Sequence, residues 1–259
     1  MWERKYKTFK YWVIFSYVML SMLLLTSISH AQSNSDQLTL VSGVGTIAVF
    51  FMGVLGWIVN AARSSFLGLK RGFDIVLALI GMVLAAPIVA AVAILIKIVS
   101  PGPIFFKQER VGYKGKLFQI YKIRTMKIDA EKYTGPIWAM ENDPRLIKCG
   151  KIIRKMHIDE LPQLFNVLKG EMSIVGPRPE RPVFVEKLSG EIADYKKRIN
   201  VKPGITGLAQ VRLKYDETIK DVRKKVKYDL LYIREMCLMV DLRILLRTVF
   251  VVLTGKGAR

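Results

Sequence analysis

Three long stretches of the chain carry no charged residue, at residues 11–29, 38–62 and 75–96. Each stretch is long enough to cross the core of a bilayer, which takes about 20 apolar residues in a helix. The 259 residues nevertheless have a formal net charge of +20, and most of the 41 Lys and Arg follow Ile96. A chain that separates apolar and basic parts in this way is predicted to be a membrane protein with one basic globular domain.

The globular part is poor in residues suited to disulfides or zinc. Cys149 and Cys237 are the only cysteines, and His30 and His157 are the only histidines. Two lone thiols fit a reducing cytosol better than a disulfide framework, and we expect no structural zinc site. The basic charge indicates an anionic partner, which could be a lipid headgroup, a phosphorylated substrate or a nucleic acid.

The basic residues around the first two runs predict their orientation. Lys and Arg precede the first run and follow the second, whereas the connector at residues 31–39 has neither. By the positive-inside rule, the N-terminus and the chain from residue 63 onward lie in the cytoplasm. A cleavable signal peptide ending near residues 29–31 is the alternative, and the length of the first run favours an uncleaved anchor.

The third run has basic residues on both sides, so both ends favour the cytoplasmic face. Pro87 lies near its middle, where a proline removes a helix hydrogen bond and bends the axis. A helix that enters one leaflet, bends at Pro87 and returns would keep both ends in the cytoplasm. An ordinary kinked span is the alternative, because long basic domains can be translocated despite their charge.

The segment at residues 158–170, Ile-Asp-Glu-Leu-Pro-Gln-Leu-Phe-Asn-Val-Leu-Lys-Gly, is the first candidate for a chemical site. Pro162 is tolerated only in a first helical turn, so the helix should begin close to Asp159 and stop at Gly170. Asp159 and Glu160 would then lie at the positive helix end, where carboxylates stay ionised and phosphates bind. Simple capping is the alternative for such a pair. The predicted apolar face of the helix consists of Leu161, Leu164, Phe165 and Leu168.

Rigid turns and cations accompany this pair along the chain. Arg178 is enclosed by prolines in Gly-Pro-Arg-Pro-Glu at residues 176–180, so its guanidinium could fork onto a phosphate. Arg124 lies in Lys-Ile-Arg-Thr-Met at residues 122–126, and Arg154 lies just before the acidic pair. Together these features indicate a site that handles a pyrophosphate.

The tail at residues 222–253 has a helical pattern and could lie on the membrane surface or close the core of the domain.

These segments form an ordered series of motifs. They are Lys-Arg-Gly-Phe-Asp at 70–74, the helix broken by Pro87, Ser-Pro-Gly-Pro at 100–103, Gln-Glu-Arg-Val-Gly at 108–112, Lys-Ile-Arg-Thr-Met at 122–126, Asp-Glu-Leu-Pro-Gln-Leu at 159–164, Gly-Pro-Arg-Pro-Glu at 176–180 and Pro-Gly-Ile-Thr-Gly at 203–207. From about residue 68 to the C-terminus, the chain resembles the bacterial sugar transferase family, the monotopic polyprenyl-phosphate phosphoglycosyl transferases.

The resemblance implies an α+β membrane protein in the bacterial inner membrane. The resemblance does not extend to residues 1–67, which lie outside the smallest form of the family; their two apolar runs predict an N-terminal anchor with transmembrane helices at 11–29 and 38–62. Residues 68–259 would form a mostly helical cytoplasmic catalytic domain with short strands and a re-entrant helix at 75–98, bent at Pro87. Strand-like pieces occur at residues 102–108 and 116–121.

The resemblance also implies an activity. The enzyme would transfer a phosphosugar from a nucleotide diphosphate-sugar, with a preference for uridine, to polyprenyl phosphate and release the nucleoside monophosphate. This would be the first membrane step of a surface glycan or exopolysaccharide pathway, with other glycan-assembly enzymes as partners. Asp159 would be the nucleophile that forms a covalent aspartyl-phosphosugar, and Glu160 would act beside it. Asp159 and Glu160 would hold Mg²⁺, while Arg124 and Arg154 would bind the substrate phosphates. Arg178 is predicted to join them because of its rigid turn, independently of the resemblance.

Two other function classes fit parts of the sequence. A tethered basic module that binds lipid or nucleic acid would explain the charge, but it would not need the acidic pair. The chain also has no basic stretch interleaved with aromatic residues for stacking on bases, so no nucleic acid is expected. A transporter subunit would explain the apolar runs, but these runs hold no charged residue.

Overall fold

The computed structural model describes residues 35–132, 135, 143–213 and 218–254. The chain divides into two compact units, Met1–Leu67 and Gly68–Arg259. The first apolar run and the alternative of a signal peptide lie outside the described residues. The mixture of helices with a few short strands confirms the predicted α+β class.

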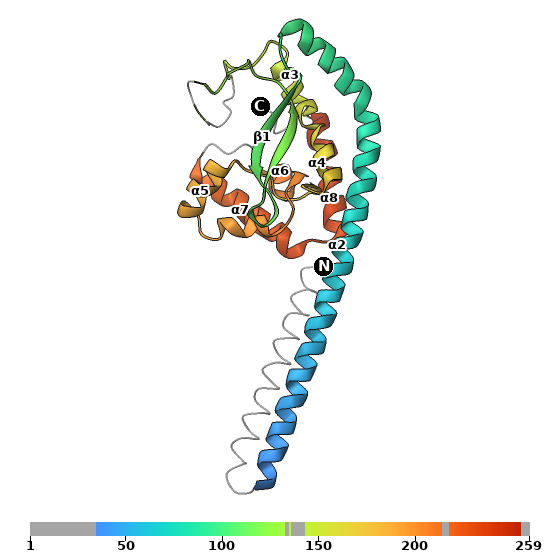
Figure 1. Ribbon diagram of the computed structural model, residues 1–259, viewed down its shortest axis with the longest axis vertical. Coiled ribbons are helices and arrows are strands. Elements are labelled where there is room, and N and C mark those ends of the chain that lie inside the picture. The colour runs from blue at the N-terminus through green and yellow to red at the C-terminus, as the bar shows by residue number, and fades with distance from the viewer. Residues whose placement is uncertain (1–34, 133–134, 136–142, 214–217, 255–259) are drawn as a thin grey trace. The chain divides into compact units, whose positions relative to one another are not determined.

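A single helix, α2 (Ser35–Val99), holds the second and third apolar runs and continues through the basic segment between them. Pro87 lies inside α2 and does not end it, and Figure 1 shows the last part of the helix curving towards β1. Within the described residues, one helical stretch, Ser64–Val99, is long and apolar enough to cross a bilayer. The re-entrant path at residues 75–98 stays a prediction.

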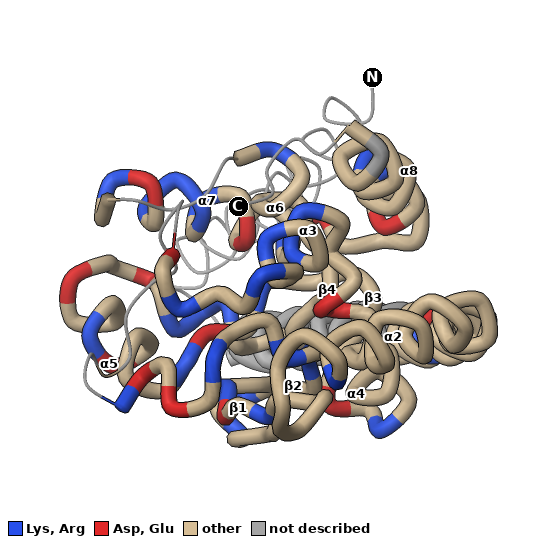
Figure 2. The backbone as a smooth tube through the Cα atoms, turned by 90° about the horizontal axis from the view of Figure 1, so that it is seen from above, with Lys and Arg blue, Asp and Glu red and all other residues tan. Residues whose placement is uncertain are grey.

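In the second unit, one face of α2 packs against the rest of the unit. Lys70, Asp74, Ala78 and Ala85 are buried, and their spacing places them on one side of the helix. The opposite side exposes apolar side chains, among them Val83, Leu84 and Ile98. In Figure 2 the visible turns of α2 are almost without charge, whereas Lys and Arg gather around α3 and along α7. An exposed apolar face of this kind is suited to lipid.

Two small sheets follow α2. Strands β1 (Phe105–Val111) and β2 (Leu117–Ile123) form an antiparallel hairpin in which Phe105 pairs with Ile123. Strands β3 (Ser173–Val175) and β4 (Gly204–Thr206) are parallel and belong to segments about 30 residues apart. Both predicted strand regions are therefore confirmed, with the first beginning and ending a few residues later than expected.

The remaining helices surround these strands. They are α3 (Gly150–Lys155), η2 (Ile158–Glu160), α4 (Gln163–Lys169), α5 (Pro182–Glu191), η3 (Tyr195–Asn200), α6 (Leu208–Arg212), α7 (Ile219–Glu235) and α8 (Leu238–Thr254), besides the short turn η1 (Tyr113–Gly115). The C-terminal tail is thus two helices, with a break between Glu235 and Leu238.

The main hydrophobic core joins α2, β2, α4, β3, α7 and α8. Its buried members are Ala78, Phe118, Ile120, Val167, Met172, Ile174, Val175, Tyr232 and Ile244. Strand β3 is wholly buried, so the turn that follows it begins at a fixed place. Helix α8 directs Asp241 and Ile244 inward and exposes Leu246 and Phe250. The tail therefore closes the core with one face, and its other face is an exposed apolar surface.

Candidate active site

Asp159 and Glu160 lie in η2, a single 3₁₀ turn that precedes α4. We expected the helix to start close to Asp159; a helical turn does start there, but it is 3₁₀, and the α-helix itself begins only at Gln163. A full α-helical turn beginning at Asp159 would bring the Pro162 ring against the carbonyl of Ile158, so the segment tightens instead. Helix α4 starts after Pro162 and ends at Gly170, whose φ of 83° is the left-handed conformation of a C-terminal stop.

Helix α4 is fixed to β2 by Asn166, which is wholly buried. The backbone amide of Tyr121 donates to Asn166 Oδ1 at 3.1 Å, and Asn166 Nδ2 donates to the carbonyl of Gln119 at 2.7 Å. Leu164 and Leu168 pack on the core as predicted, but Phe165 is 46% exposed and stands edge-on to Tyr121. The buried amide therefore determines which strand lies beside the acidic pair.

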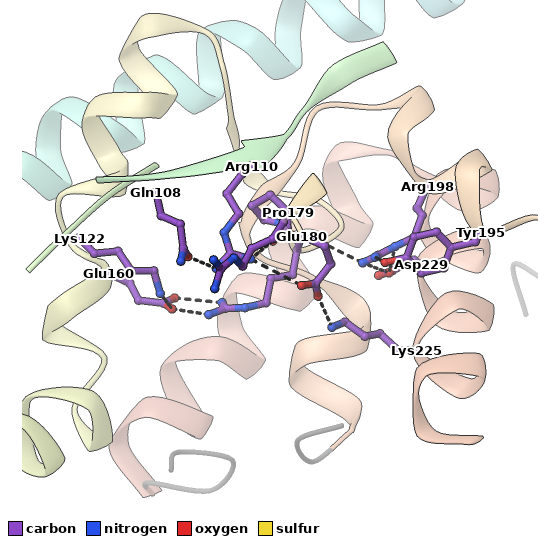
Figure 3. Close-up of polar contacts among 12 residues, drawn as sticks. Gln108, Arg110, Lys122, Glu160, Pro179, Glu180, Tyr195, Arg198, Lys225 and Asp229 are labelled. Carbon is purple, nitrogen blue, oxygen red and sulfur yellow. Dashed lines mark hydrogen bonds and ion pairs between the residues drawn. The ribbon is translucent and has the colours of Figure 1, made fainter. Parts of the chain in front are cut away.

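Glu160 is held by two cations from distant parts of the chain (Figure 3). Lys122 Nζ on β2 lies 2.8 Å from Glu160 Oε1, and the Arg178 guanidinium binds both carboxylate oxygens, with Nη1 at 3.2 Å from Oε2. Burial alone would raise the pKa of Glu160, but Arg178 and Lys122 hold this pKa well below its usual range. Glu160 is therefore an ionised carboxylate with a fixed orientation.

Asp159 is buried beside this cluster, with only 7% of its surface exposed. Its Oδ2 lies 3.8 Å from Lys122 Nζ, so it is the less tightly paired of the two carboxylates. Burial raises the pKa of Asp159, and the negative charge of Glu160 adds to this, while Lys122, Arg154 and Arg178 oppose it. A carboxylate with a raised pKa is more basic, and this favours its use as a nucleophile.

The structure brings two of the three predicted arginines to the acidic pair. Arg178 binds Glu160, and Arg154, whose Nε donates to Thr125 Oγ1 at 2.9 Å, lies close enough to lower the pKa of Asp159. Arg124 is buried and turned away, with its guanidinium donating to the carbonyls of Ser100 and Pro101 at 2.6 and 3.0 Å. Arg124 lies just beyond the end of β2, where strand alternation no longer fixes its direction. Its contacts favour a structural role, and phosphate binding by Arg124 stays a prediction.

The Arg178 turn, residues 176–180, is held through its own backbone (Figure 3). Arg198 Nη2 donates to the Arg178 carbonyl and Arg110 Nη1 donates to the Pro179 carbonyl, each at 3.1 Å. Arg198 is itself paired with buried Asp229 at 2.7 Å. Sequence reasoning missed these contacts, and it also missed Lys122, although Lys122 opens the same motif as Arg124. The turn therefore presents the Arg178 side chain from a fixed backbone.

Asp159 and Glu160 are also the candidate metal ligands. The described residues contain no group of three or more His, Cys, Asp or Glu that could enclose a metal. Mg²⁺ needs only one or two protein carboxylates when substrate phosphates complete its shell, so the pair has the right chemistry for such an ion. Because Lys122 and Arg178 already bind the oxygens of Glu160, Asp159 is the better placed ligand.

Several known proteins are similar to this chain in sequence. An Aeromonas hydrophila UDP-N-acetylgalactosamine-undecaprenyl-phosphate N-acetylgalactosaminephosphotransferase is 47% identical over 191 residues, which are 74% of this chain and 45% of that protein. An Escherichia coli K12 UDP-glucose:undecaprenyl-phosphate glucose-1-phosphate transferase is 43% identical over 192 residues, covering 73% of this chain and 41% of that protein. The exopolysaccharide production protein PSS of Rhizobium leguminosarum is 40% identical over 198 residues, covering 73% of this chain and 98% of that protein.

The chain thus spans less than half the length of the first two relatives and nearly all of the third. The bacterial sugar transferase family matches residues 65–255, which include α2 from its middle, the acidic pair and the Arg178 turn. The ordered motifs, the clustered carboxylates and cations, and this match lead to one conclusion: the chain belongs to the bacterial sugar transferase family.

Proposed function

We propose that this protein is a membrane-embedded phosphoglycosyl transferase that moves a phosphosugar from a uridine diphosphate-sugar to polyprenyl phosphate and releases the nucleoside monophosphate. The observation that carries the proposal is the pair of buried Asp159 and partly buried Glu160 with Lys122, Arg154 and Arg178 around it. The names of two relatives, which contain a UDP-sugar and undecaprenyl phosphate, support the choice of donor and acceptor.

The proposed chemistry has two steps. In the first, a carboxylate oxygen of Asp159 attacks the phosphorus bonded to the sugar. An Asp159–phosphorus bond forms, and the bond to the bridging oxygen breaks, so that the nucleoside monophosphate leaves with the electron pair. In the second step, an oxygen of the lipid phosphate attacks the same phosphorus and the Asp159 carboxylate is released. Such a covalent intermediate divides one difficult transfer into two easier ones.

The charges around the pair suit this reaction. Lys122, Arg154 and Arg178 supply three positive charges against the two carboxylates, a balance of 3 − 2 = +1 in the cluster before substrate binds. An anionic nucleophile that approaches an anionic diphosphate is repelled, and preorganised cations offset the charge that develops. Glu160 orients Lys122 and Arg178 and thereby keeps their donors near Asp159. A magnesium ion held by Asp159, with Glu160 beside it, would supply further positive charge to the phosphates.

The location follows the same proposal. The catalytic unit would lie on the cytoplasmic face of the bacterial inner membrane, where nucleotide sugars are made available, and the apolar face of α2 at 75–98 would enter the bilayer as a re-entrant helix. The acceptor is a membrane lipid, so a site held against the bilayer is required. The product would enter a surface glycan or exopolysaccharide pathway, in which other glycan-assembly enzymes would be partners.

The test of the proposed function is direct. The full-length protein in lipid nanodiscs is incubated with Mg²⁺, undecaprenyl phosphate and one of several uridine diphosphate-sugars, and uridine monophosphate is measured. We expect release with at least one donor, together with a phosphosugar-lipid product. A tethered binding module would give neither product with any donor.

We expect both ends of the third apolar run to lie on one side of the membrane. Single cysteines at Ser65 and Lys114, introduced after replacement of Cys149 and Cys237, should react alike with an impermeant thiol reagent added to spheroplasts. Ser65 and Lys114 are both exposed, so burial does not hide either one. Labelling of one position from outside and of the other only after lysis would instead establish a full span.

We expect Arg178→Lys to lower kcat/KM for the donor by roughly 10- to 100-fold, because a two-pronged contact to a charged group becomes a point contact. The change also removes one of the two bonds to Glu160. The matched control is Arg181→Lys, since Arg181 makes a similar fork on Glu131 at 2.8 and 3.0 Å, away from the acidic pair. Equal kinetics for the two variants would mean that the Arg178 fork has no role with substrate.

A further inference from the structure

The proposed chemistry does not use Lys70 and Asp74, two buried charged residues on α2. Both face strand β3. Lys70 Nζ donates to the Val175 carbonyl at 3.1 Å and pairs with Asp241 Oδ2 on α8. Asp74 Oδ1 accepts from the backbone amide of Ile174 at 3.0 Å. Each of these contacts joins α2 to a segment about 100 or more residues away in the sequence.

The Val175 carbonyl is the centre of these contacts. Besides Lys70 Nζ, the Tyr232 hydroxyl and the Ser173 hydroxyl each lie 3.0 Å from it. The Tyr232 hydroxyl also lies 2.8 Å from Asp241 Oδ1, and Asp241 and Tyr232 have 0% and 1% of their surfaces exposed. We call Lys70, Ser173, Val175, Tyr232 and Asp241 the Val175 cluster. It fixes the direction of one peptide group from α2, α7 and α8 together.

Val175 is the residue directly before the Arg178 turn. The next amide, that of Gly176, donates to the Thr206 carbonyl at 2.9 Å, and Gly204 donates to the Pro177 carbonyl at 2.9 Å. Three residues after Val175, the guanidinium of Arg178 meets Glu160. A continuous series of hydrogen bonds and one short turn therefore connects Lys70 on the apolar helix with the acidic pair.

The chemical nature of the cluster suggests more than packing. Burying a lysine and an aspartate costs desolvation, and apolar residues of similar volume would stabilise the core at least as well. Unlike apolar side chains, ionic and hydroxyl donors fix the orientation of the carbonyl group that they contact. The carbonyl fixed in this way is that of Val175, the residue directly before the Arg178 turn.

We propose that Lys70, Tyr232 and Asp241 are positioning residues that act through Val175 to fix the Arg178 turn against Glu160, so that the seating of the apolar helix α2 sets the geometry of the active site. The kinetic part of this inference rests on the proposed function. The structural part, that the cluster holds the turn, does not.

The test removes one hydroxyl from the cluster. Tyr232→Phe deletes the atom that contacts both Val175 and Asp241, and Tyr228→Phe, one turn earlier on α7, deletes a hydroxyl outside the cluster. Amide hydrogen exchange of peptides covering residues 173–180 should be faster in Tyr232→Phe and unchanged in Tyr228→Phe. For the donor, Tyr232→Phe should lower kcat/KM about 10-fold, the effect of one hydrogen bond to a buried group.

A double-mutant cycle separates positioning from general destabilisation. If Tyr232 acts through Arg178, adding Tyr232→Phe to Arg178→Lys should lower kcat/KM by less than twofold further. A full additional 10-fold loss, or exchange in Tyr232→Phe identical to that in Tyr228→Phe, would overturn the inference. If Tyr232→Phe does not fold, Ser173→Ala removes another donor to the same carbonyl and is judged by the same two outcomes.

Exchange also distinguishes the two proposals. Faster exchange at residues 173–180 in a protein that releases no nucleoside monophosphate from any donor would disprove the proposed function while supporting the structural role of the cluster. If the wild type is active and Tyr232→Phe changes neither exchange nor kcat/KM, the proposed function would be supported and the positioning role of the cluster would be disproved.

Discussion

Asp159→Asn is expected to lower nucleoside monophosphate release by a factor on the order of 10³ or more, because the amide is a poor nucleophile. Wild-type protein given donor and Mg²⁺ without the polyprenyl phosphate acceptor should release one nucleoside monophosphate per active enzyme and then stop. The same protein should gain the mass of one phosphosugar in intact mass spectrometry. Asp159→Asn should show neither the burst nor the added mass.

The fold should survive this change, because asparagine has nearly the same volume as aspartate and removes a charge whose burial raises the pKa of Asp159. Asp194→Asn is the control, since Asp194 is exposed and pairs only at the surface with Lys197 at 2.8 Å. Asp194 has a φ of 63°, which asparagine also tolerates. Monophosphate that appears only after acceptor is added, without an adduct on Asp159, would establish direct transfer to the lipid and leave the family assignment unchanged.

Gly204→Ala is expected to be strongly destabilising, with a loss of about 3 kcal/mol or more in the free energy of unfolding. A Cβ at position 204 would overlap the amide nitrogen of Gly176 and lie 2.6 Å from its Cα and 2.5 Å from the Thr206 carbonyl. These are backbone atoms of the paired strands and their turn, so they cannot rotate away. Activity should fall with stability, because Gly176 begins the Arg178 turn.

The measurement is the thermal unfolding midpoint in detergent, where this loss corresponds to a decrease of roughly 6 to 12 °C for a unit of this size. Gly190→Ala is the control, because a Cβ at the exposed position 190 on α5 meets no atom within 4 Å. Alanine is the better helix former, so this control should keep or slightly raise the midpoint. A midpoint for Gly204→Ala equal to that of Gly190→Ala would mean that β3 and β4 separate at little cost.

Some features of this protein are determined by sequence over short distances. Apolar runs produce the long helix α2, because helix formation and lipid compatibility depend on consecutive residues. Gly170 ends α4, since the stop needs only one residue that adopts a positive φ. The hairpin of β1 and β2 falls where the strand-like segments were expected. The ordered motifs were also enough to place the family, which the match over residues 65–255 confirms.

Other features were decided only by the tertiary structure. Lys122 and Arg178 meet at Glu160 from positions 38 and 18 residues away, and Arg124 turns to Ser100 although it shares a motif with Lys122. Periodicity and capping describe neighbours along the chain, whereas the direction of a cation depends on which elements pack beside it. That packing is set here by buried groups such as Asn166 and Lys70, which have hydrogen-bond partners about 45 to 170 residues away. The sequence by itself therefore determined the long apolar helix and the acidic pair, and tertiary packing decided which charges surround that pair, because only packing brings distant side chains within hydrogen-bonding distance.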